Sequence, residues 1–468
     1  MILYYEEINN EKEKYLRYYF IYLIIIHSFF FIVILYNVKQ QRFSPYSPNI
    51  KSIKIGNGSY AKIGIISDLH LSYDSKNKKD IFSYSRNNTY IALKYFKKVG
   101  IDILIIVGDL IQNNQLTNLI YFKKILYSVY KDIYRPIIIT LMGNHDYDIN
   151  NNNIESQKIF YKLINSCPYS HYLINGYNFI FFSQKNTTIN KETIKNYSWL
   201  KNQLDISLQM TKKKGDPIFV FTHIPPKDTV YGSEILGNNE IYSLLNNYHQ
   251  VICISGHSHH SMKNIKSIWQ GNFTVINTQS ISFINPTMIY NNSIINVQEV
   301  RFESAKNSFS MGFIAHLTDN NIIFERIEFL TEKVIDERWI INFPIYVENF
   351  KYTFKKRNKV AIPTFKNKMI NIEKKKNKNS INLYVTFYET KYFDYINLYK
   401  IILKNMVSRY KKYTFLYYSD YYKTVNKRKN KIKLRLPNLI IPGIYDIEIR
   451  AIDSFENESI IIKCLIKI

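Results

Sequence analysis

Five short motifs place metal-ligating side chains in series along the chain. They combine carboxylate, amide and imidazole groups, the mixture that holds pairs of catalytic divalent cations. The motifs are Asp68-Leu69-His70, Gly108-Asp109, Gly143-Asn144-His145-Asp146, Thr222-His223 and Gly256-His257-Ser258-His259. Two such cations lower the pKa of bound water and offset the charge that grows on a phosphoryl group under attack. The chemistry that this set favours is metal-assisted hydrolysis of phosphate esters.

Each motif follows an apolar run that the sequence predicts to be a buried strand. In open α/β sheets, the loops beyond the carboxyl ends of the strands converge on one crevice. Asp68 and His70 are two residues apart, as are His257 and His259. In extended backbone, both members of such a pair point to the same side of the chain. The motif glycines permit tight turns and close approach of backbone to ligand.

From about residue 60 to 335, apolar strand-like runs alternate with helical stretches. The predicted strands are 63–66, 101–107, 136–141, 218–221 and 251–254. The predicted helices are 86–99, 115–131, 191–211 and 233–247. Continuous apolar runs are typical of strands covered on both faces, which predicts an α/β sandwich. Residues 312–317 and 322–324 flank an Asp-Asn-Asn turn and predict a hairpin.

The order of the five motifs resembles the calcineurin-like metallophosphoesterase superfamily over roughly 60–335. The resemblance implies a metallophosphoesterase-type β-sandwich flanked by helices, and hydrolysis by attack of a metal-bridging hydroxide. It implies that the first metal is bound by Asp68, His70 and His259. It implies that the second metal is bound by Asn144, His223 and His257. Asp109 would bridge both metals, and His145 would be the catalytic histidine beside the scissile ester.

The mixed ligand set admits manganese, iron or zinc, so the expected cofactors are two divalent metal ions of undetermined identity. Two departures narrow the class. The Asp109 motif lacks the Asp-Arg-Gly continuation of protein Ser/Thr phosphatases. Gln112 stands where purple acid phosphatases carry a metal-binding tyrosine. The remaining resemblance is to bacterial-type phosphodiesterases, some of which have a C-terminal β-sandwich tail.

Residues 18–36 form a stretch of nineteen residues without a formal charge. As a helix, such a stretch can cross a hydrocarbon layer of ~30 Å. A cleaved signal peptide would have a shorter apolar region followed by small residues, whereas Asn-Val-Lys-Gln-Gln-Arg follows here. A buried globular helix is the third interpretation. We favour an uncleaved N-terminal anchor with the catalytic domain outside the cytoplasm, although the flanking basic residues are nearly balanced.

Beyond a basic stretch at 351–379, apolar and polar residues alternate with the period of two that is typical of strands. The sequence predicts a C-terminal all-β (Ig-like) domain. The expected organisation is an N-terminal tail (1–17), a transmembrane anchor (18–37), a metallophosphoesterase domain (60–335) and a C-terminal β-sandwich-like domain (345–468).

The formal net charge of +26 invites a nucleic-acid or anionic-membrane partner, but the basic residues are spread along the chain. The three cysteines are far apart and form neither a disulfide framework nor a CxxC zinc pattern. We expect a membrane-anchored phosphohydrolase acting on small-molecule or lipid-linked phosphoesters, with the lipid bilayer as a partner through the N-terminal helix. A nuclease of the same superfamily and a non-catalytic surface adhesion or binding protein remain alternatives.

Overall fold

The structure is a computed structural model. It describes residues 43–73, 83–113, 115–131, 135–147, 153–185, 191–284, 287–290, 293–296, 310–335, 337–357, 362–377, 380–390, 396–407, 412–419, 431–436 and 443–467. The predicted N-terminal tail (1–17) and transmembrane anchor (18–37) lie outside these residues. Among the helices that the structure describes, none is long and apolar enough to cross a membrane.

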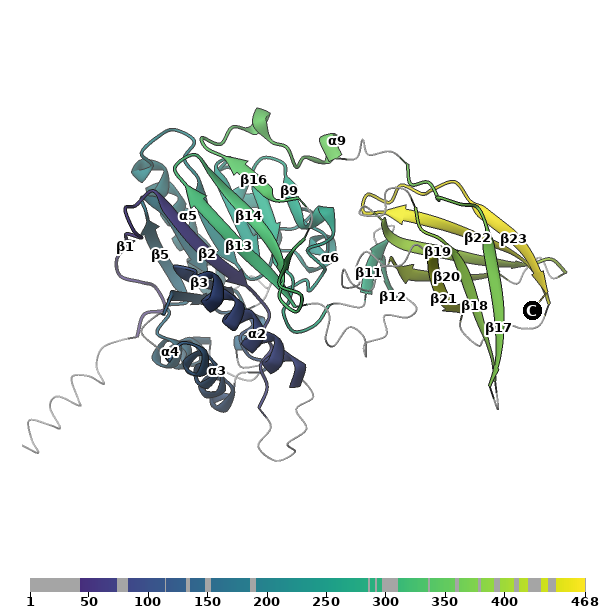
Figure 1. Ribbon diagram of the computed structural model, residues 1–468. Coiled ribbons are helices and arrows are strands. Elements are labelled where there is room, and N and C mark those ends of the chain that lie inside the picture. The colour runs from purple at the N-terminus through teal and green to yellow at the C-terminus, as the bar shows by residue number, and fades with distance from the viewer. Residues whose placement is uncertain are drawn as a thin grey trace, which may run out of the picture. The chain divides into compact units, whose positions relative to one another are not determined.

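Two seven-stranded sheets form the centre of the fold (Figure 1). The first sheet consists, in spatial order, of β1 (Lys51–Ile53), β5 (Tyr169–Ile174), β6 (Tyr177–Phe182), β7 (Ile218–Thr222), β8 (Val251–Ser255), β10 (Thr274–Asn277) and β9 (Ile268–Gln270). The second sheet consists of β15 (Lys333–Val334), β14 (Asn321–Glu328), β13 (Met311–Thr318), β2 (Tyr60–Ile66), β3 (Ile103–Val107) and β4 (Ile137–Leu141), with β16 (Trp339–Asn342) also paired to β14.

Parallel pairing at the centre of each sheet brings the motif loops to one edge. In the second sheet β2, β3 and β4 are parallel neighbours, and in the first sheet β6, β7 and β8 are. The motifs follow β2, β3, β4, β7 and β8, so all five leave the sheets at carboxyl ends of parallel strands. This topology confirms the expected convergence.

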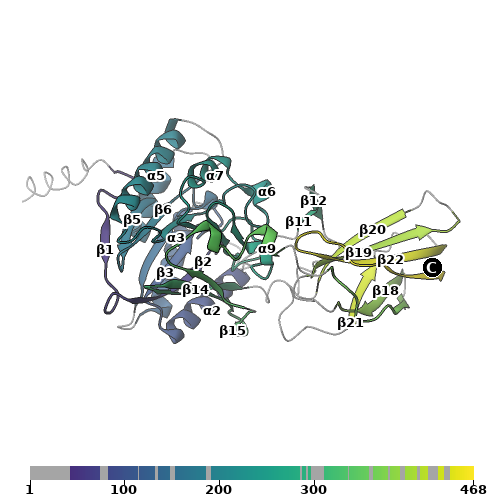
Figure 2. The same cartoon turned by 90° about the horizontal axis from the view of Figure 1, so that it is seen from above.

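Helices cover the outer faces of the two sheets. The described helices are α2 (Ser83–Val99), α3 (Leu116–Val129), α4 (Asn153–Ile164), α5 (Lys191–Met210), α6 (Ser233–Leu236), α7 (Asn239–Leu245) and α9 (Phe354–Arg357). Short 3₁₀ turns are η1 (Asn144–Asp146), η2 (Ile265–Ser267) and η3 (Val347–Asn349). Figure 2 shows α5 and α7 on one side of the sheets and α2 on the other.

Three apolar layers hold these elements together. Between the sheets, alternate residues of facing strands such as Ile63, Ile105, Phe181 and Phe221 form one cluster. The opposite residues of β2 and β3 pack against α2, α3 and α4. Those of β6, β7 and β8 pack against α5 and α7. Each central strand is therefore covered on both faces, which explains its unbroken run of β-branched and aromatic residues.

The C-terminal residues form two further antiparallel sheets. One contains β17 (Ile370–Asn377), β18 (Ser380–Tyr388) and β21 (Lys431–Leu436); the other contains β20 (Lys412–Tyr418), β19 (Ile396–Asn405), β22 (Ile444–Asp453) and β23 (Ile462–Lys467). Their inward side chains form one apolar cluster, which draws all its members from residue 365 onward. A separate short hairpin pairs β11 (Thr287–Tyr290) with β12 (Ser293–Asn296).

Most predicted elements are present, with shifted ends. The hairpin predicted at 312–324 is β13 and β14, and it is longer than expected. The helix predicted at 233–247 is wrong, because two helices occupy it. Gly237 ends α6, and the Asn238 side chain accepts the backbone N–H of Ile241 to begin α7. Two further elements, α4 and the β5–β6 hairpin, were not predicted from the sequence.

Candidate metal centre

Six of the seven predicted metal ligands gather into two overlapping groups. Asp68, His70, Asp109 and His259 form one group, and Asp109, His223 and His257 form the other. In each group the candidate ligand atoms lie within 4.8 Å of one another. These are the first-metal and second-metal sets that the resemblance implied, apart from Asn144. Asp109 is common to both.

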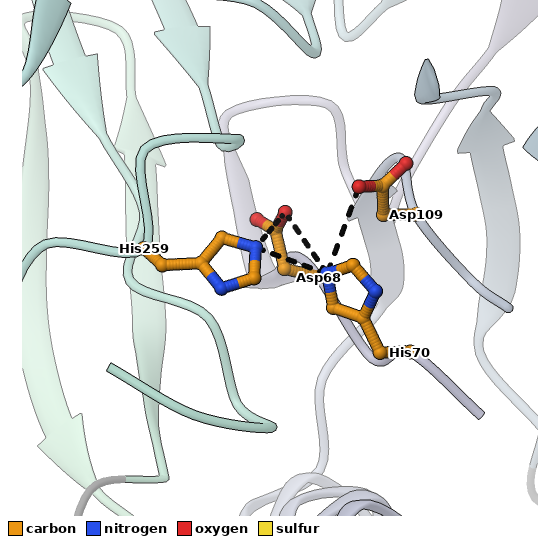
Figure 3. Close-up of side chains that lie close together, drawn as sticks. All are labelled: Asp68, His70, Asp109 and His259. Carbon is orange, nitrogen blue, oxygen red and sulfur yellow. Dashed lines mark hydrogen bonds and ion pairs between the residues drawn. The ribbon is translucent and has the colours of Figure 1, made fainter. Parts of the chain in front are cut away.

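In the first group, nitrogen and oxygen atoms from three loops face one another (Figure 3). The Nε2 atoms of His70 and His259 are 3.0 Å apart. Oδ1 of Asp68 is 3.0 Å from His259 Nε2 and 3.8 Å from His70 Nε2. Oδ2 of Asp109 is 3.6 Å from His70 Nε2. All four side chains are at most 9% exposed, so their ligand atoms lie close together and are largely shielded from solvent.

In the second group, His223 is fixed on both sides of its ring. Its Nδ1 is 2.8 Å from the carbonyl oxygen of Val107, which can only accept, so Nδ1 carries a proton. Its Nε2 lies 3.1 Å from Oδ2 of Asp109. The ring of His257 packs edge-on against that of His223, with centroids 5.2 Å apart. A hydrogen bond from the far nitrogen to a carbonyl is the usual way to orient a ligating histidine.

Asn144 and His145 lie in η1, beside the shared carboxylate. The backbone N–H of His145 donates to Oδ1 of Asp109 at 2.9 Å. Oδ1 of Asn144 is buried and has no hydrogen-bond partner among the described residues. Nδ1 of His145 is 2.8 Å from the carbonyl oxygen of Gln112, and its ring packs edge-on against His70. The ring is thus oriented with Nε2 as its remaining polar atom.

The convergence of the paired ligands does not arise from extended backbone, so that expectation was wrong. Asp68, His70, Asp109, His257 and His259 all have positive φ, between 46° and 69°. Non-glycine residues rarely adopt this left-handed conformation, and such strain concentrates at functional sites. Each ligand loop therefore reverses direction within a residue or two, which aims its side chains back over the end of the sheet.

Charges within the cluster shift the pKa values of its members strongly. Burial raises the pKa of Asp68, but the charges of His259 and His223 outweigh burial and hold it well below its usual value. The pKa of Asp109 is also lowered, because His223 outweighs burial. Burial lowers the pKa of His223, yet Asp109 and Asp68 raise it to about 10. The cluster is thus a strongly anionic field that binds positive charge.

The donor set fits divalent cations. Buried carboxylates need nearby positive charge, and without a cation the His223 imidazolium supplies it. Oδ1 of Asn144 is a buried atom with no hydrogen-bond partner in the described part of the chain, and Nε2 of His223 faces the Asp109 carboxylate. A Cβ on Gly143 would lie 2.2 Å from Asp109 Oδ1, and one on Gly256 would lie 2.6 Å from Asp68 Oδ2. The two glycines make room for the carboxylates.

Several residues that support the cluster were not predicted from sequence. Ser67 donates to Oδ2 of Asp68 at 2.5 Å, and the backbone N–H of His257 donates to the same oxygen at 3.1 Å. Phe283 packs against the rings of His259 and His70. Phe283 follows no metal-ligand motif, so no signal in the sequence marks it. Ser67 could have been found as the strand-end neighbour of a ligand.

Asp146 belongs to the same motif as Asn144 and His145 but lies outside both ligand groups. Its carboxylate accepts backbone N–H groups of Gly143, Leu110 and Ile111 at 2.9 to 3.3 Å. Burial, together with repulsion from Asp109, raises its pKa to about 8. Asp146 therefore ties the Asp109 loop to the Asn144 loop.

Residues 61–261 match the family model of calcineurin-like phosphoesterases. This part of the chain belongs to that family. The match covers all five motifs and confirms the resemblance inferred from their order. With the buried ligand cluster, it identifies this part of the chain as a metal-dependent phosphoesterase domain, and thus as a hydrolase that acts on ester bonds.

Among solved structures, the similar chains have low sequence identity and TM-scores below 0.5. One is GAP50, described as the anchor in the inner membrane complex of Plasmodium: 16% identity, a TM-score of 0.43, and coverage of 64% of this chain and 92% of that chain. Another is the purple acid phosphatase PPD1 from yellow lupin seeds: 15% identity, a TM-score of 0.41, and coverage of 61% and 54%. No curated protein matches the chain. The family assignment of the phosphoesterase domain therefore rests on residues 61–261.

Proposed function

We propose that this phosphoesterase is a membrane-anchored phosphohydrolase that uses two divalent cations to cleave phosphodiesters or phosphomonoesters. The observation that carries the proposal is the shared position of Asp109, whose carboxylate belongs to both buried ligand groups. One carboxylate between two imidazole-rich groups is the arrangement that a two-cation site requires. Asp68, His70 and His259 would hold one cation, and Asn144, His223 and His257 the other.

Each of these side chains has a definite task. The cations, when bound, supply Lewis-acid charge and lower the pKa of water. Asp68 and Asp109 retain their negative charge in a dry site, because neighbouring histidines hold their pKa values down. His223 presents Nε2 because its Nδ1–H is committed to Val107. Ligand atoms fixed before the reaction need no reorganisation during it, which is the main source of electrostatic catalysis.

We assign the proton transfer to His145. Its Nδ1 hydrogen is committed to the carbonyl oxygen of Gln112, so Nε2 is the atom left to exchange a proton with substrate. The half-buried ring lies against His70, at the border of the first ligand group. A protonated Nε2 can donate to the departing alcohol oxygen, which a general acid must do as the ester bond breaks.

The test is hydrolysis of bis-p-nitrophenyl phosphate by the metal-stripped full chain, reloaded in turn with manganese, zinc or iron. His145→Ala should lower kcat by about 10²–10⁴-fold while metal binding stays near normal, because a general acid holds no cation. Asp109→Asn should lower both kcat and the number of cations bound. His249→Ala is the matched control, because His249 is exposed, lies outside both ligand groups and has its Nδ1 2.9 Å from the Asn272 carbonyl oxygen. An unchanged kcat in His145→Ala or Asp109→Asn would contradict the assignment.

The same preparation separates the alternatives. Cleavage of single- or double-stranded DNA that weakens steeply with added salt would indicate a nuclease. Full cation loading without turnover of any phosphoester would indicate a binding protein that keeps the site as a scaffold. A panel of nucleotide, sugar and lipid-linked phosphoesters then defines the substrate class.

We also propose that residues 18–36 anchor the protein in a bilayer, with the phosphoesterase domain outside the cytoplasm. The support is the nineteen-residue stretch without formal charge, followed by a large C-terminal body. Alkaline extraction of membranes should leave the full chain in the pellet and release a chain that lacks residues 1–42. Protease added to sealed cells should digest the phosphoesterase domain. Release of the full chain, or protection from the protease, would contradict the anchor or its orientation respectively.

A further inference from the structure

The two sheets contribute different ligands to the candidate metal centre. Asp68, His70, Asp109 and Asn144 follow strands of the second sheet, whereas His223, His257 and His259 follow strands of the first sheet. The ligand groups therefore exist only while the loop 256–264, which leaves β8 of the first sheet, is held against the second sheet. Contacts between this loop and the second sheet must therefore hold the loop in position.

The loop 256–264 carries strain that its surroundings must overcome. His257 and His259 have φ values of 69° and 55°, in the left-handed region. Residues persist there only where neighbouring contacts enforce the conformation. At the start of the loop, the His257 N–H donates to Asp68 and the Gly256 N–H donates to the His223 carbonyl. The end of the loop, after His259, needs an equivalent restraint.

A buried ion pair provides it. Nζ of Lys263, four residues after His259, lies 3.5 Å from Oε1 of Glu328 at the end of β14. Both side chains are 0% exposed. The other carboxylate oxygen of Glu328 accepts the hydroxyl of Thr331 at 2.6 Å. A buried charge whose partner is removed is strongly unfavourable, so this pair pins the loop to the second sheet.

The Arg326 guanidinium, on β14 of the second sheet, holds the same loop by a hydrogen bond to the loop backbone. Arg326 donates from Nη1 to the carbonyl oxygen of Met262 at 3.0 Å and from Nη2 to that of Glu337 at 3.0 Å. Its guanidinium lies 4.5 Å from the ring centroid of Trp339, on β16 of the same sheet. The N–H of Met262 donates to Gln279 at 3.3 Å. Both backbone groups of Met262 are thus fixed, three residues beyond His259.

We propose that Lys263, Glu328 and Arg326 are positioning residues for the metal centre. They fasten the His257–His259 loop of the first sheet to the second sheet, where Asp68 and Asp109 lie, and so hold the two halves of the ligand set together. The proposal rests on the metal-ligand roles assigned under the proposed function. They act on the ligands through the loop, by the Lys263–Glu328 ion pair and the Arg326–Met262 hydrogen bond, so their effect is on cation affinity.

The structure offers a matched control for this ion pair. Lys266, three residues further along the chain, pairs with Glu234 at 3.1 Å. Glu234 lies in α6, between β7 and β8 of the first sheet, so this pair does not reach the second sheet. The two side chains are 23% and 22% exposed. Lys266 thus forms the same kind of ion pair as Lys263 and lies close to it in the chain, but its pair does not connect the two sheets.

The experiment is titration of the metal-stripped full chain with Mn²⁺ by calorimetry, at a temperature below the unfolding transition of every variant. Lys263→Met, Glu328→Gln and Arg326→Met should each weaken Mn²⁺ binding by about 10–100-fold, the range for supports of metal ligands. Lys266→Met should stay within about twofold of wild type, as for a partly exposed pair. Excess Mn²⁺ should restore most of kcat in the weakened variants. The exchanged pair Lys263→Glu with Glu328→Lys should regain affinity over either single variant.

These measurements separate positioning from general stability. If the residues served stability alone, folded variants would bind Mn²⁺ with wild-type affinity and show only a lower melting temperature. That result, or an equal loss in Lys266→Met, would overturn the proposal. A wild-type chain that binds no Mn²⁺, Zn²⁺ or Fe²⁺ would overturn the proposed function and this inference together. Wild-type binding with unaffected variants would overturn the inference alone.

Discussion

At the scale of single residues, the candidate centre is defined by buried charges that need opposite charge. Asp68 and Asp109 are both at most 1% exposed, and each faces His223. Carboxylates in so dry a place persist only with cationic neighbours. In the metal-free protein that neighbour is the His223 imidazolium. A bound cation would take over this role, and His223 would then lose the proton on Nε2. Metal binding and proton release are therefore coupled at this residue.

The coupling predicts a pH dependence for the metal-free protein. The pKa of His223 is raised from 6.5 to about 10 in the folded state. Because the folded pKa exceeds the unfolded one, the stabilisation from this group is complete below pH 6.5 and is lost as the pH rises through about 10. We expect the melting temperature in EDTA to fall over this window. In His223→Asn the fall should be smaller; an identical fall in both proteins would refute the assignment.

At the scale of the elements, we expect the glycines of the ligand loops to be required because a Cβ would clash with a ligand, not because glycine makes the backbone flexible. A Cβ at Gly143 would lie 2.2 Å from Asp109 Oδ1, although the φ of Gly143 is an ordinary −96°. Gly143→Ala should displace the shared carboxylate and lower kcat/KM by about 10²-fold, the typical result of a 1 Å misplacement. The measurement is hydrolysis of bis-p-nitrophenyl phosphate together with Mn²⁺ affinity.

Gly100 provides the control for that substitution. Its φ is +68°, but a Cβ there would meet nothing within 4 Å. Gly100→Ala should therefore cost about 1–2 kcal/mol of stability through the left-handed backbone and leave kcat/KM unchanged. If Gly143→Ala were as active as Gly100→Ala, the close approach of the Asn144 loop to Asp109 would not be required for activity.

The ligand loops also show what could be predicted from sequence and what could not. The residue types of Asp68, Asp109 and His223, placed after apolar runs, predicted a shared site because parallel strands end at one edge. The backbone that aims them was not predicted, since left-handed φ values at Asp68 and His259 depend on contacts with other loops. The ion pair of Lys263 and Glu328 was not predicted either, because its members are sixty-five residues apart and meet only through the packing of the two sheets.

At the scale of the whole molecule, cation binding links the two sheets. The first ligand group joins His259 of the first sheet to Asp68 of the second sheet. A cation that binds only the folded state should stabilise it by about 2.7 kcal/mol at a free concentration 100 times Kd. Removal of metal with EDTA should therefore lower the melting temperature. In the double variant Asp109→Asn/His223→Asn, EDTA should have little effect; an equal shift would place the bound metal elsewhere.

The C-terminal sheets should be dispensable for the chemistry itself. Their apolar cluster uses only residues from 365 onward, and every candidate ligand lies between residues 68 and 259. Elements with separate cores behave as separate folding units. The core between the two phosphoesterase sheets extends to Phe350, beyond the domain end predicted at 335. A chain that ends at residue 357 should hydrolyse bis-p-nitrophenyl phosphate with a kcat within about threefold of the full chain.

That truncation needs a control for folding and a second substrate class. The truncated chain should unfold in a single cooperative transition followed by circular dichroism, and its Mn²⁺ affinity should match that of the full chain. Turnover of vesicle-borne phospholipid esters should be compared with that of the soluble ester, because a binding role of the C-terminal sheets would slow only a substrate that they recognise. A truncated chain that is folded but has lost Mn²⁺ affinity would show that these sheets support the metal centre, contrary to the separation of the apolar cores.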